Sequence, residues 1–311
     1  MSGPTPLLHH YWLSPFSEKM RLMFGHCDIA WGSVEHSMRL PRPELMLLTG
    51  GYRKMPVMQQ GADIYCDTRL MSTQLMAWSG RDDLLPEARR QEVQELSDFA
   101  DSRLFFVVIT ASMGGSALRA LRREHGATWG ELLRVVWDRV GMMRGAEVPR
   151  IPPKVARREL HAFLQRFEQE LEGPFRFGDG PTLADFSVYH VLRFGHETLR
   201  ADFLRHYPRL LDWMARMAAI GHGRYHDVPI RDALEEAAVH SPAEPGPLVA
   251  PPSDCEIGDA VTIRPADYGT IPTQGILIGA PAGSWVLRRE VEGLGALHVH
   301  FPRQGYHLRP A

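Results

Sequence analysis

The stretch that decides the fold is Leu13-Ser-Pro-Phe-Ser-Glu-Lys-Met-Arg21. It follows a short apolar run that starts at Leu7, and it opens a segment whose apolar residues have helical spacing. This pattern predicts a strand, a tight turn and then a helix. Pro15 suits the first helical turn, where its missing N–H costs nothing. Ser14 therefore lies at or beside the N-cap, where a hydroxyl can cap the helix or meet an anion.

A second stretch, Arg53-Lys-Met-Pro-Val-Met58, begins another apolar run. Gly61-Ala62 predicts a hairpin turn after it, and Asp67-Thr68 opens a helix with apolar residues on one face. A proline at the start of a strand inside a domain is unusual. We therefore expect the bond between Met55 and Pro56 to be cis.

The two stretches together resemble the thioredoxin-like domain of the glutathione transferase family. Thioredoxin-like redox enzymes carry Cys-Pro-x-Cys after the first strand, and here the same turn is Ser14-Pro-Phe-Ser17. Met55-Pro56-Val57 matches the cis-proline segment of the family, and Asp67-Thr68 matches its acidic-then-hydroxyl pair at a helix start. Because hydroxyls replace both sulfurs, dithiol exchange of the glutaredoxin kind is not expected.

The resemblance covers residues 6–235 and implies two domains. An α/β thioredoxin-like domain that binds glutathione would occupy residues 1–80, and an all-helical domain would occupy residues 86–239. Thr182-Leu-Ala-Asp185 has the pattern of a capping box, in which the threonine and the acid three residues later satisfy each other's backbone groups. In glutathione transferases this box opens a buried helix, so it is a folding device.

Helical spacing also marks other parts of this half. We expect helices at residues 129–143, 155–171 and 230–239, and a break at Gly114-Gly115.

The spacing of apolar residues is no longer helical after a linker at residues 240–253, which holds five prolines. Short apolar runs separated by Gly and Pro predict about five strands in residues 254–311, and so a small all-β barrel of the SH3-like type. The family resemblance says nothing about this region. We expect it to be an appendage, so that a chain ending near Val239 folds and binds glutathione without it.

The resemblance assigns Ser14 as the group that activates the glutathione thiol, with Ser17 and Tyr11 as alternatives. The thiolate is the reactive form, and a hydroxyl donating to the sulfur at a helix N-terminus favours it. The other interpretation of Ser14 is a helix cap without a catalytic role.

Glutathione is an extended tripeptide with two carboxylates and one ammonium, so its site needs a strand edge and opposite charges at the ends. Val57 would pair with the backbone of the ligand, next to Met55 and Pro56. Asp67 would take the γ-glutamyl ammonium and Thr68 its carboxylate. Lys54 would meet the glycyl carboxylate, although it can equally be a solvated surface lysine. Capping is the alternative role of the Asp67-Thr68 pair.

The acceptor would lie between the two domains. Its candidate lining residues, which can equally be core or dimer contacts, are Phe105, Phe106, Ile109, Met113, Trp137 and Met142. His298 and His300 lie on one face of a predicted strand, but no third ligand has a recognisable spacing, so no metal site is expected.

Composition excludes several classes of protein. The chain has 311 residues, 44% of them hydrophobic and 23% charged, and a net charge of −2. These values indicate a globular protein without the basic footprint of a nucleic-acid binder. No secretory signal or membrane-spanning run is visible. Three widely spaced cysteines form no paired motif, which favours a reducing cytoplasm.

The sequence thus predicts a cytoplasmic glutathione transferase in which Ser14 activates glutathione, the co-substrate, for attack on a small apolar electrophile. Homodimerisation is implied by the resemblance alone. The main alternative is a non-catalytic binding or assembly module that docks a protein partner through its C-terminal barrel. An isomerase or lyase that uses glutathione is a third interpretation, because the acceptor pocket is the least readable part of the chain.

Overall fold

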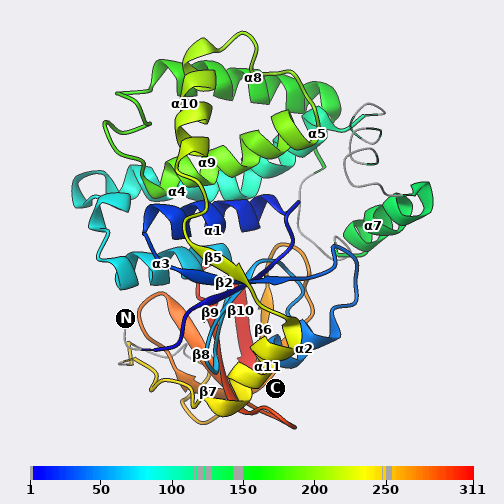
Figure 1. Cartoon of the computed structure of the whole chain (residues 1–311), viewed down its shortest axis with the longest axis vertical. Helices are drawn as coiled ribbons and strands as arrows, with labels where there is room; N and C mark the ends of the chain where they lie inside the picture. Colours follow the sequence, from blue (N-terminus) through cyan, green and yellow to red (C-terminus); the bar gives the residue numbers. More distant parts are fainter. Residues whose placement is uncertain are drawn as a thin grey trace.

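The computed structural model describes residues 3–114, 117, 119, 122, 128–142, 150–246, 248–249 and 254–311. Helices α8, α9 and α10 lie at one end of the molecule, a large sheet lies at the other, and helix α1 lies between them (Figure 1). Gly115 of the expected break and Met143 of an expected helix lie outside the described residues.

The N-terminal part has the thioredoxin-like arrangement that the sequence predicts. Its elements are β1 (Leu7–His10), α1 (Pro15–His26), β2 (Trp31–Glu35), α2 (Pro43–Thr49), β3 (Val57–Gln60), β4 (Asp63–Cys66) and α3 (Thr68–Ser79). The strand order is β4-β3-β1-β2, in which β1 and β2 are parallel and the other pairs are antiparallel. The bond between Met55 and Pro56 is cis, as expected, and so is the bond between Leu40 and Pro41.

The second part is helical. It contains η1 (Asp82–Leu84), η2 (Glu87–Arg89), α4 (Arg90–Phe99), the π-helix η3 (Ala100–Leu104), α5 (Phe105–Ser112), α7 (Trp129–Met142), α8 (Pro153–Gln169), α9 (Leu183–Arg193), the π-helix η4 (Phe194–Thr198), α10 (Pro208–Ala219) and α11 (Ile230–Val239). The capping box at the start of α9 is present, and Thr182 donates its backbone N–H to Asp185 Oδ2 at 2.9 Å. No helix in the described part of the chain is long and apolar enough to cross a membrane.

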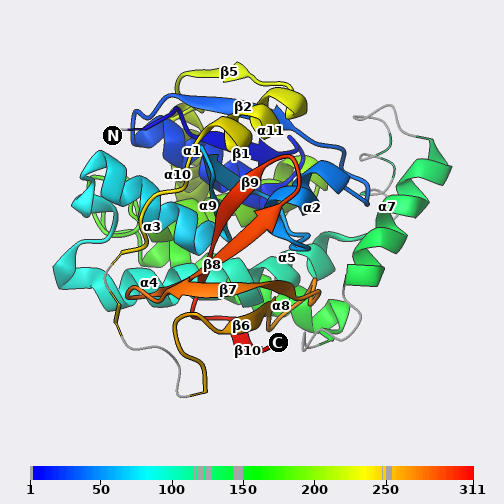
Figure 2. The same cartoon turned by 90° about the horizontal axis from the view of Figure 1, so that it is seen from below.

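The C-terminal part consists of strands. They are β6 (Ala260–Pro265), β7 (Thr273–Gly279), β8 (Ser284–Val291), β9 (Gly295–Pro302) and β10 (Tyr306–Pro310), in the order β10-β6-β7-β8-β9. Figure 2 shows these strands crossing below the thioredoxin-like part. The all-strand region agrees with the sequence. The described pairings run from β10 to β9 without pairing β9 to β10, so closure into a barrel stays a prediction.

The C-terminal strands are joined to the thioredoxin-like sheet and do not form a separate appendage. Strand β9 pairs in parallel with β4, with Ile64 opposite Val299, and the short strand β5 (Tyr225–Asp227) pairs with β2 at the opposite edge. A ten-stranded sheet results among the described residues. The edge of β4 would otherwise present unpaired backbone groups, which β9 satisfies.

A shared apolar core strengthens this joint. Leu45 and Leu48 of α2 and Ile64 of β4 belong to the same buried cluster as Leu287 and Val299 of the C-terminal strands. Strand pairing and burial thus link residues more than 200 positions apart, and the folding of a chain that ends near Val239 stays a prediction. Which partner strand an edge will take is not encoded in the local pattern.

Candidate functional site

Three sequence elements predicted to form the site meet at one end of the thioredoxin-like sheet. Val57, at the start of β3, is in register with His9 near the end of β1 and with Cys66 at the end of β4. The turn that carries Ser14 follows β1, and Asp67 follows β4. The sheet topology therefore brings the three predicted segments together.

Ser14 is the N-cap of α1, and its side chain is 2% exposed. Its Oγ accepts a hydrogen bond from the backbone N–H of Ser17 at 3.2 Å, and its own N–H donates to the Tyr11 carbonyl at 3.0 Å. No described residue accepts the Ser14 hydroxyl proton. Ser14 therefore caps the helix as an acceptor and keeps its donor for another group.

The two alternatives to Ser14 are placed differently. Ser17 lies inside α1, fully buried, and its Oγ has no hydrogen-bond partner among the described residues. Tyr11 is half-buried, and the Arg42 guanidinium lies 5.5 Å from the centre of its ring. Arg42 in turn donates to the carbonyl oxygens of Ser37, Met38 and Arg53, so it holds the loops around α2.

Asp67 is the N-cap of α3, in a positive-φ conformation (φ 77°) that a residue with a side chain rarely adopts. Its Oδ1 accepts from the Arg69 N–H at 3.0 Å, and its Oδ2 accepts from the Tyr306 hydroxyl at 2.9 Å. Thr68 follows it and is 7% exposed. Backbone strain of this kind is concentrated at ligand-binding positions, which favours a binding role beside the capping role.

Lys54 does not lie free at the surface. Its Nζ is 2.5 Å from Asp267 Oδ1, 4.3 Å from the centre of the Tyr268 ring and 5.8 Å from that of Tyr306. The Lys54 side chain is 10% exposed, whereas that of Asp267 is 48% exposed. The surface-lysine interpretation is therefore wrong for this residue, because the β6–β7 loop and strand β10 cover it.

Tyr306 is a hydrogen-bond donor at this site. Burial and the nearby Asp67 carboxylate raise the pKa of Tyr306 well above its usual value, so its hydroxyl keeps its proton. The hydroxyl lies 3.3 Å from that of Tyr52, whose pKa is raised by burial and by Asp67 in the same way.

Asp267, Tyr268 and Tyr306 were missed from the sequence. The first two lie between two predicted strands, and the third lies in a final strand that the apolar pattern does not reveal.

The loop between β6 and β7, residues 266–272, also reaches the candidate acceptor walls. The ring of Tyr268 lies edge-on to Phe106 at 6.3 Å between centroids, and the Gly269 N–H donates to the Met142 carbonyl at 2.9 Å. Phe105 packs edge-on against Phe16, one residue into α1. Ile109 is half-buried like Phe105 and Phe106, whereas Met113 is 42% exposed and Trp137 is 68% exposed.

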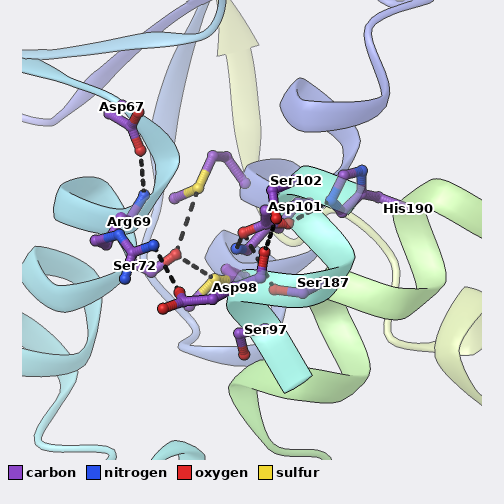
Figure 3. A network of polar contacts seen from close by, with 12 residues as sticks. Asp67, Arg69, Ser72, Ser97, Asp98, Asp101, Ser102, Ser187 and His190 are labelled. Carbon is purple, nitrogen blue, oxygen red and sulfur yellow. Dashed lines mark hydrogen bonds and ion pairs between the residues drawn. The ribbon is translucent and has the colours of Figure 1, made fainter. Parts of the chain in front are cut away.

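A second polar cluster lies between α1 and the helical part (Figure 3). Asp101, in the π-helix η3, accepts from Lys19 Nζ at 2.6 Å and from His190 Nε2 at 2.9 Å, and lies 3.4 Å from the Ser187 hydroxyl. Burial acts to raise the pKa of Asp101, but Lys19 and His190 together hold it below its usual range. Burial lowers the pKa of His190, which stays neutral. The cluster is a structural link between the two parts.

The predicted histidine pair on β9 has partners of its own. His300 Nε2 donates to Asp63 Oδ1 at 2.8 Å, and His298 Nδ1 lies 2.9 Å from the Ala243 carbonyl. Among the described residues no group of three or more His, Cys, Asp or Glu side chains is arranged to hold a metal ion.

A surface cavity of about 400 Å³ is lined by the N-terminal loop, residues 27–30, Trp78, Ser79 and Arg224. None of the site residues predicted from sequence lines this cavity.

The thioredoxin-like and helical parts define the glutathione transferase class of fold. Residues 8–77 match the family model "Glutathione S-transferase, N-terminal domain", and residues 147–222 match "Glutathione S-transferase, C-terminal domain". A GST-like protein from Pseudomonas syringae is 32% identical over 100% of both chains, with a TM-score of 0.82. This chain therefore belongs to the glutathione S-transferase family, and the similarity extends over its C-terminal strands.

More distant structures share the fold alone. FzlA from C. crescentus is 19% identical with a TM-score of 0.52, and a glutathione S-transferase from Sinorhizobium meliloti is 17% identical with a TM-score of 0.51. Each comparison covers 74% of this chain and 92% of the other. No protein among the curated sequences compared matches the chain.

Proposed function

We propose that the protein is a glutathione-dependent transferase in which the Ser14 hydroxyl donates a hydrogen bond to the glutathione sulfur. The observation that carries this proposal is the free hydroxyl proton of Ser14 at the N-terminus of α1. A donor in the positive field of a helix start lowers the pKa of a bound thiol and so raises the thiolate fraction. Ser17 is the second candidate for this role.

The residues at the end of the sheet supply the remaining contacts in this proposal. Asp67 keeps lone pairs beyond its two hydrogen bonds and would accept from the γ-glutamyl ammonium. Thr68, at the start of α3, would hold the neighbouring carboxylate. The backbone from Met55 through Pro56 to Val57 would pair with the cysteinyl unit of glutathione.

The reaction follows from the thiolate. The sulfur attacks an electrophilic carbon of an apolar acceptor, an S–C bond forms, and the leaving group departs with the electron pair of its bond. The thiol proton passes to solvent when the thiolate forms. The acceptor would lie between Phe105, Phe106 and the β6–β7 loop. We further propose a cytoplasmic location, which suits three free, buried cysteines, and a homodimer, which gel filtration checks directly.

Calorimetric titration with glutathione tests binding. We expect the unaltered protein to bind it and the Asp67→Ala variant to lose most of the affinity, because the ammonium loses its counter-charge. Asp212→Ala, which removes an exposed carboxylate on α10, is the matched control. If the unaltered protein shows no binding at millimolar glutathione, the proposal is overturned. Protein partners of the C-terminal strands would then be the next candidates.

Turnover with 1-chloro-2,4-dinitrobenzene tests the role of Ser14. In Ser14→Ala we expect glutathione affinity to persist while turnover below pH 7 falls by roughly tenfold for each unit by which the bound thiol pKa rises. The pH profile should shift to higher pH by the same amount. Loss of the cap alone would lower the melting temperature without moving that profile. An unmoved profile would therefore exclude Ser14 from thiol activation.

A further inference from the structure

Among the described contacts of Lys54, the one with a charged group is its ion pair with Asp267 in the β6–β7 loop. The pair between Lys54 Nζ and Asp267 Oδ1 measures 2.5 Å, and the Tyr268 ring covers the ammonium at 4.3 Å. Lys54 comes directly before Met55 and Pro56, and its ammonium lies 5.8 Å from the ring of Tyr306, whose hydroxyl binds Asp67 of the predicted thiol site. An incoming carboxylate would therefore meet a cation that is already neutralised by the protein's own chain.

We propose that Asp267 and Tyr268 determine which thiols the site accepts, with Asp267 competing with the glycyl carboxylate of glutathione for Lys54. The site then favours thiols whose glycyl end carries no negative charge, such as γ-glutamyl-cysteinyl-glycine esters or amides. This inference rests on the proposed function, because it concerns the same glutathione site.

The geometry gives the two residues different parts in this selection. The carboxylate of Asp267 is 48% exposed, so it can turn from Lys54 into water when the carboxylate of a ligand takes its place beside the ammonium. Tyr268 is held more firmly, because its ring meets Phe106 and the next residue, Gly269, donates to Met142. The loop therefore keeps its position over the site, whether the Asp267 carboxylate stays paired with Lys54 or turns away from it. The Tyr268 ring covers the Lys54 ammonium, and Asp267 sets the charge beside it.

Two probes that differ only at the glycyl end, one with a carboxylate and one with a neutral ester, test the charge preference of the site. Glutathione and its glycyl monoethyl ester are titrated calorimetrically into the unaltered protein, Asp267→Asn and Glu292→Gln. The last is a control with the same change of charge at an exposed turn of the C-terminal strands. We expect the unaltered protein to bind the ester at least as tightly as the acid. In Asp267→Asn the affinity for the acid should rise by roughly two- to fivefold, the range of one solvent-accessible charge pair, while that for the ester stays unchanged.

Lys54→Met provides the second variant. Without the ammonium, the glycyl carboxylate of glutathione has no cation to bind. Adding Asp267→Asn to Lys54→Met should therefore leave the ratio of acid to ester affinity unchanged. A tenfold preference of the unaltered protein for the acid would overturn the inference, and so would an equal change in Asp267→Asn and Glu292→Gln.

The inference and the proposed function fail in different ways. If the unaltered protein binds glutathione and Asp67→Ala does not, an unchanged ratio in Asp267→Asn overturns the inference alone. If none of the variants binds either thiol, the glutathione site itself is absent and both proposals fail.

Discussion

Two lysine–aspartate pairs tie the thioredoxin-like part to the rest of the chain, and they differ in burial. Lys19 of α1 pairs with Asp101 at 2.6 Å, with side chains that are 1% and 21% exposed, and His190 adds a further hydrogen bond. Lys54 pairs with Asp267 at 2.5 Å, with side chains that are 10% and 48% exposed. The first pair joins the helical part and the second joins the C-terminal strands.

The difference shows how one kind of contact serves two purposes. A buried pair is costly to break, because the remaining charge cannot reach water. A pair in which one partner is half exposed costs less to break, so its carboxylate can give way to that of a ligand. The C-terminal joint can tolerate a weak pair because strand β9 and a shared core already hold it. The following predictions test this division.

Removal of the C-terminal joint should have the largest effect. We expect a chain ending at Val239 to lose cooperative unfolding and to aggregate, because it exposes the edge of β4 and the apolar core that β9 covers. Urea denaturation followed by circular dichroism checks this. A cooperative monomer with the stability of the full chain would show that the joint is dispensable, as the sequence alone led us to expect.

A milder change tests the same joint in the full chain. Val299→Ala, at a buried position opposite Ile64, should lower the free energy of unfolding by about 2 kcal/mol. Ile276→Ala is the control, since Ile276 lies on β7 and is 41% exposed, and we expect a change of less than about 0.5 kcal/mol there.

The contact between α1 and the helical part is tested through Asp101. Asp101→Asn should lower the free energy of unfolding at pH 7 by about 3 kcal/mol, because it leaves the Lys19 ammonium buried without a counter-charge. Asp98→Asn is a close control: Asp98 pairs with Arg69 at 2.6 Å one turn earlier, but both side chains are more than one-third exposed. We expect no more than about 1 kcal/mol from it. Equal losses in the two variants would remove burial as the explanation.

The pH dependence gives a second measurement on Asp101. Its pKa in the folded protein lies below that of the unfolded chain, so its stabilising effect is complete above about pH 4 and is lost as the pH falls. The difference between the unaltered protein and Asp101→Asn should therefore shrink by roughly 1 kcal/mol between pH 7 and pH 3. A difference that grows with acidity would contradict the assigned direction.

Local features of the molecule could be predicted from the sequence. The N-cap at Ser14, the cis bond before Pro56, the capping box from Thr182 to Asp185 and the helix from Ile230 to Val239 all depend on neighbours within a few residues. The segments that meet at the end of the thioredoxin-like sheet were predictable as well, because the family resemblance supplies its topology. Propensity, capping and turn chemistry act at this range.

Long-range partners could not be predicted. Strand β5 has three exposed residues and no apolar pattern, and β10 carries a single buried residue, Tyr306. Nothing in the local sequence says that β9 will pair with β4 or that Asp267 will reach Lys54. Such contacts depend on which edges and charges remain unpaired after the rest of the chain has folded.

The smallest expected effect concerns the second pair and decides whether it can act as a selector. Asp267→Asn should change the free energy of unfolding by less than about 1 kcal/mol, since the carboxylate is half exposed and β9 holds the joint without it. Chemical denaturation at pH 7 measures this change beside Asp101→Asn. A loss of about 3 kcal/mol would place both pairs in the same class of buried link. Asp267 could then not release Lys54 to a thiol substrate, because the energy needed would exceed what one ligand carboxylate returns.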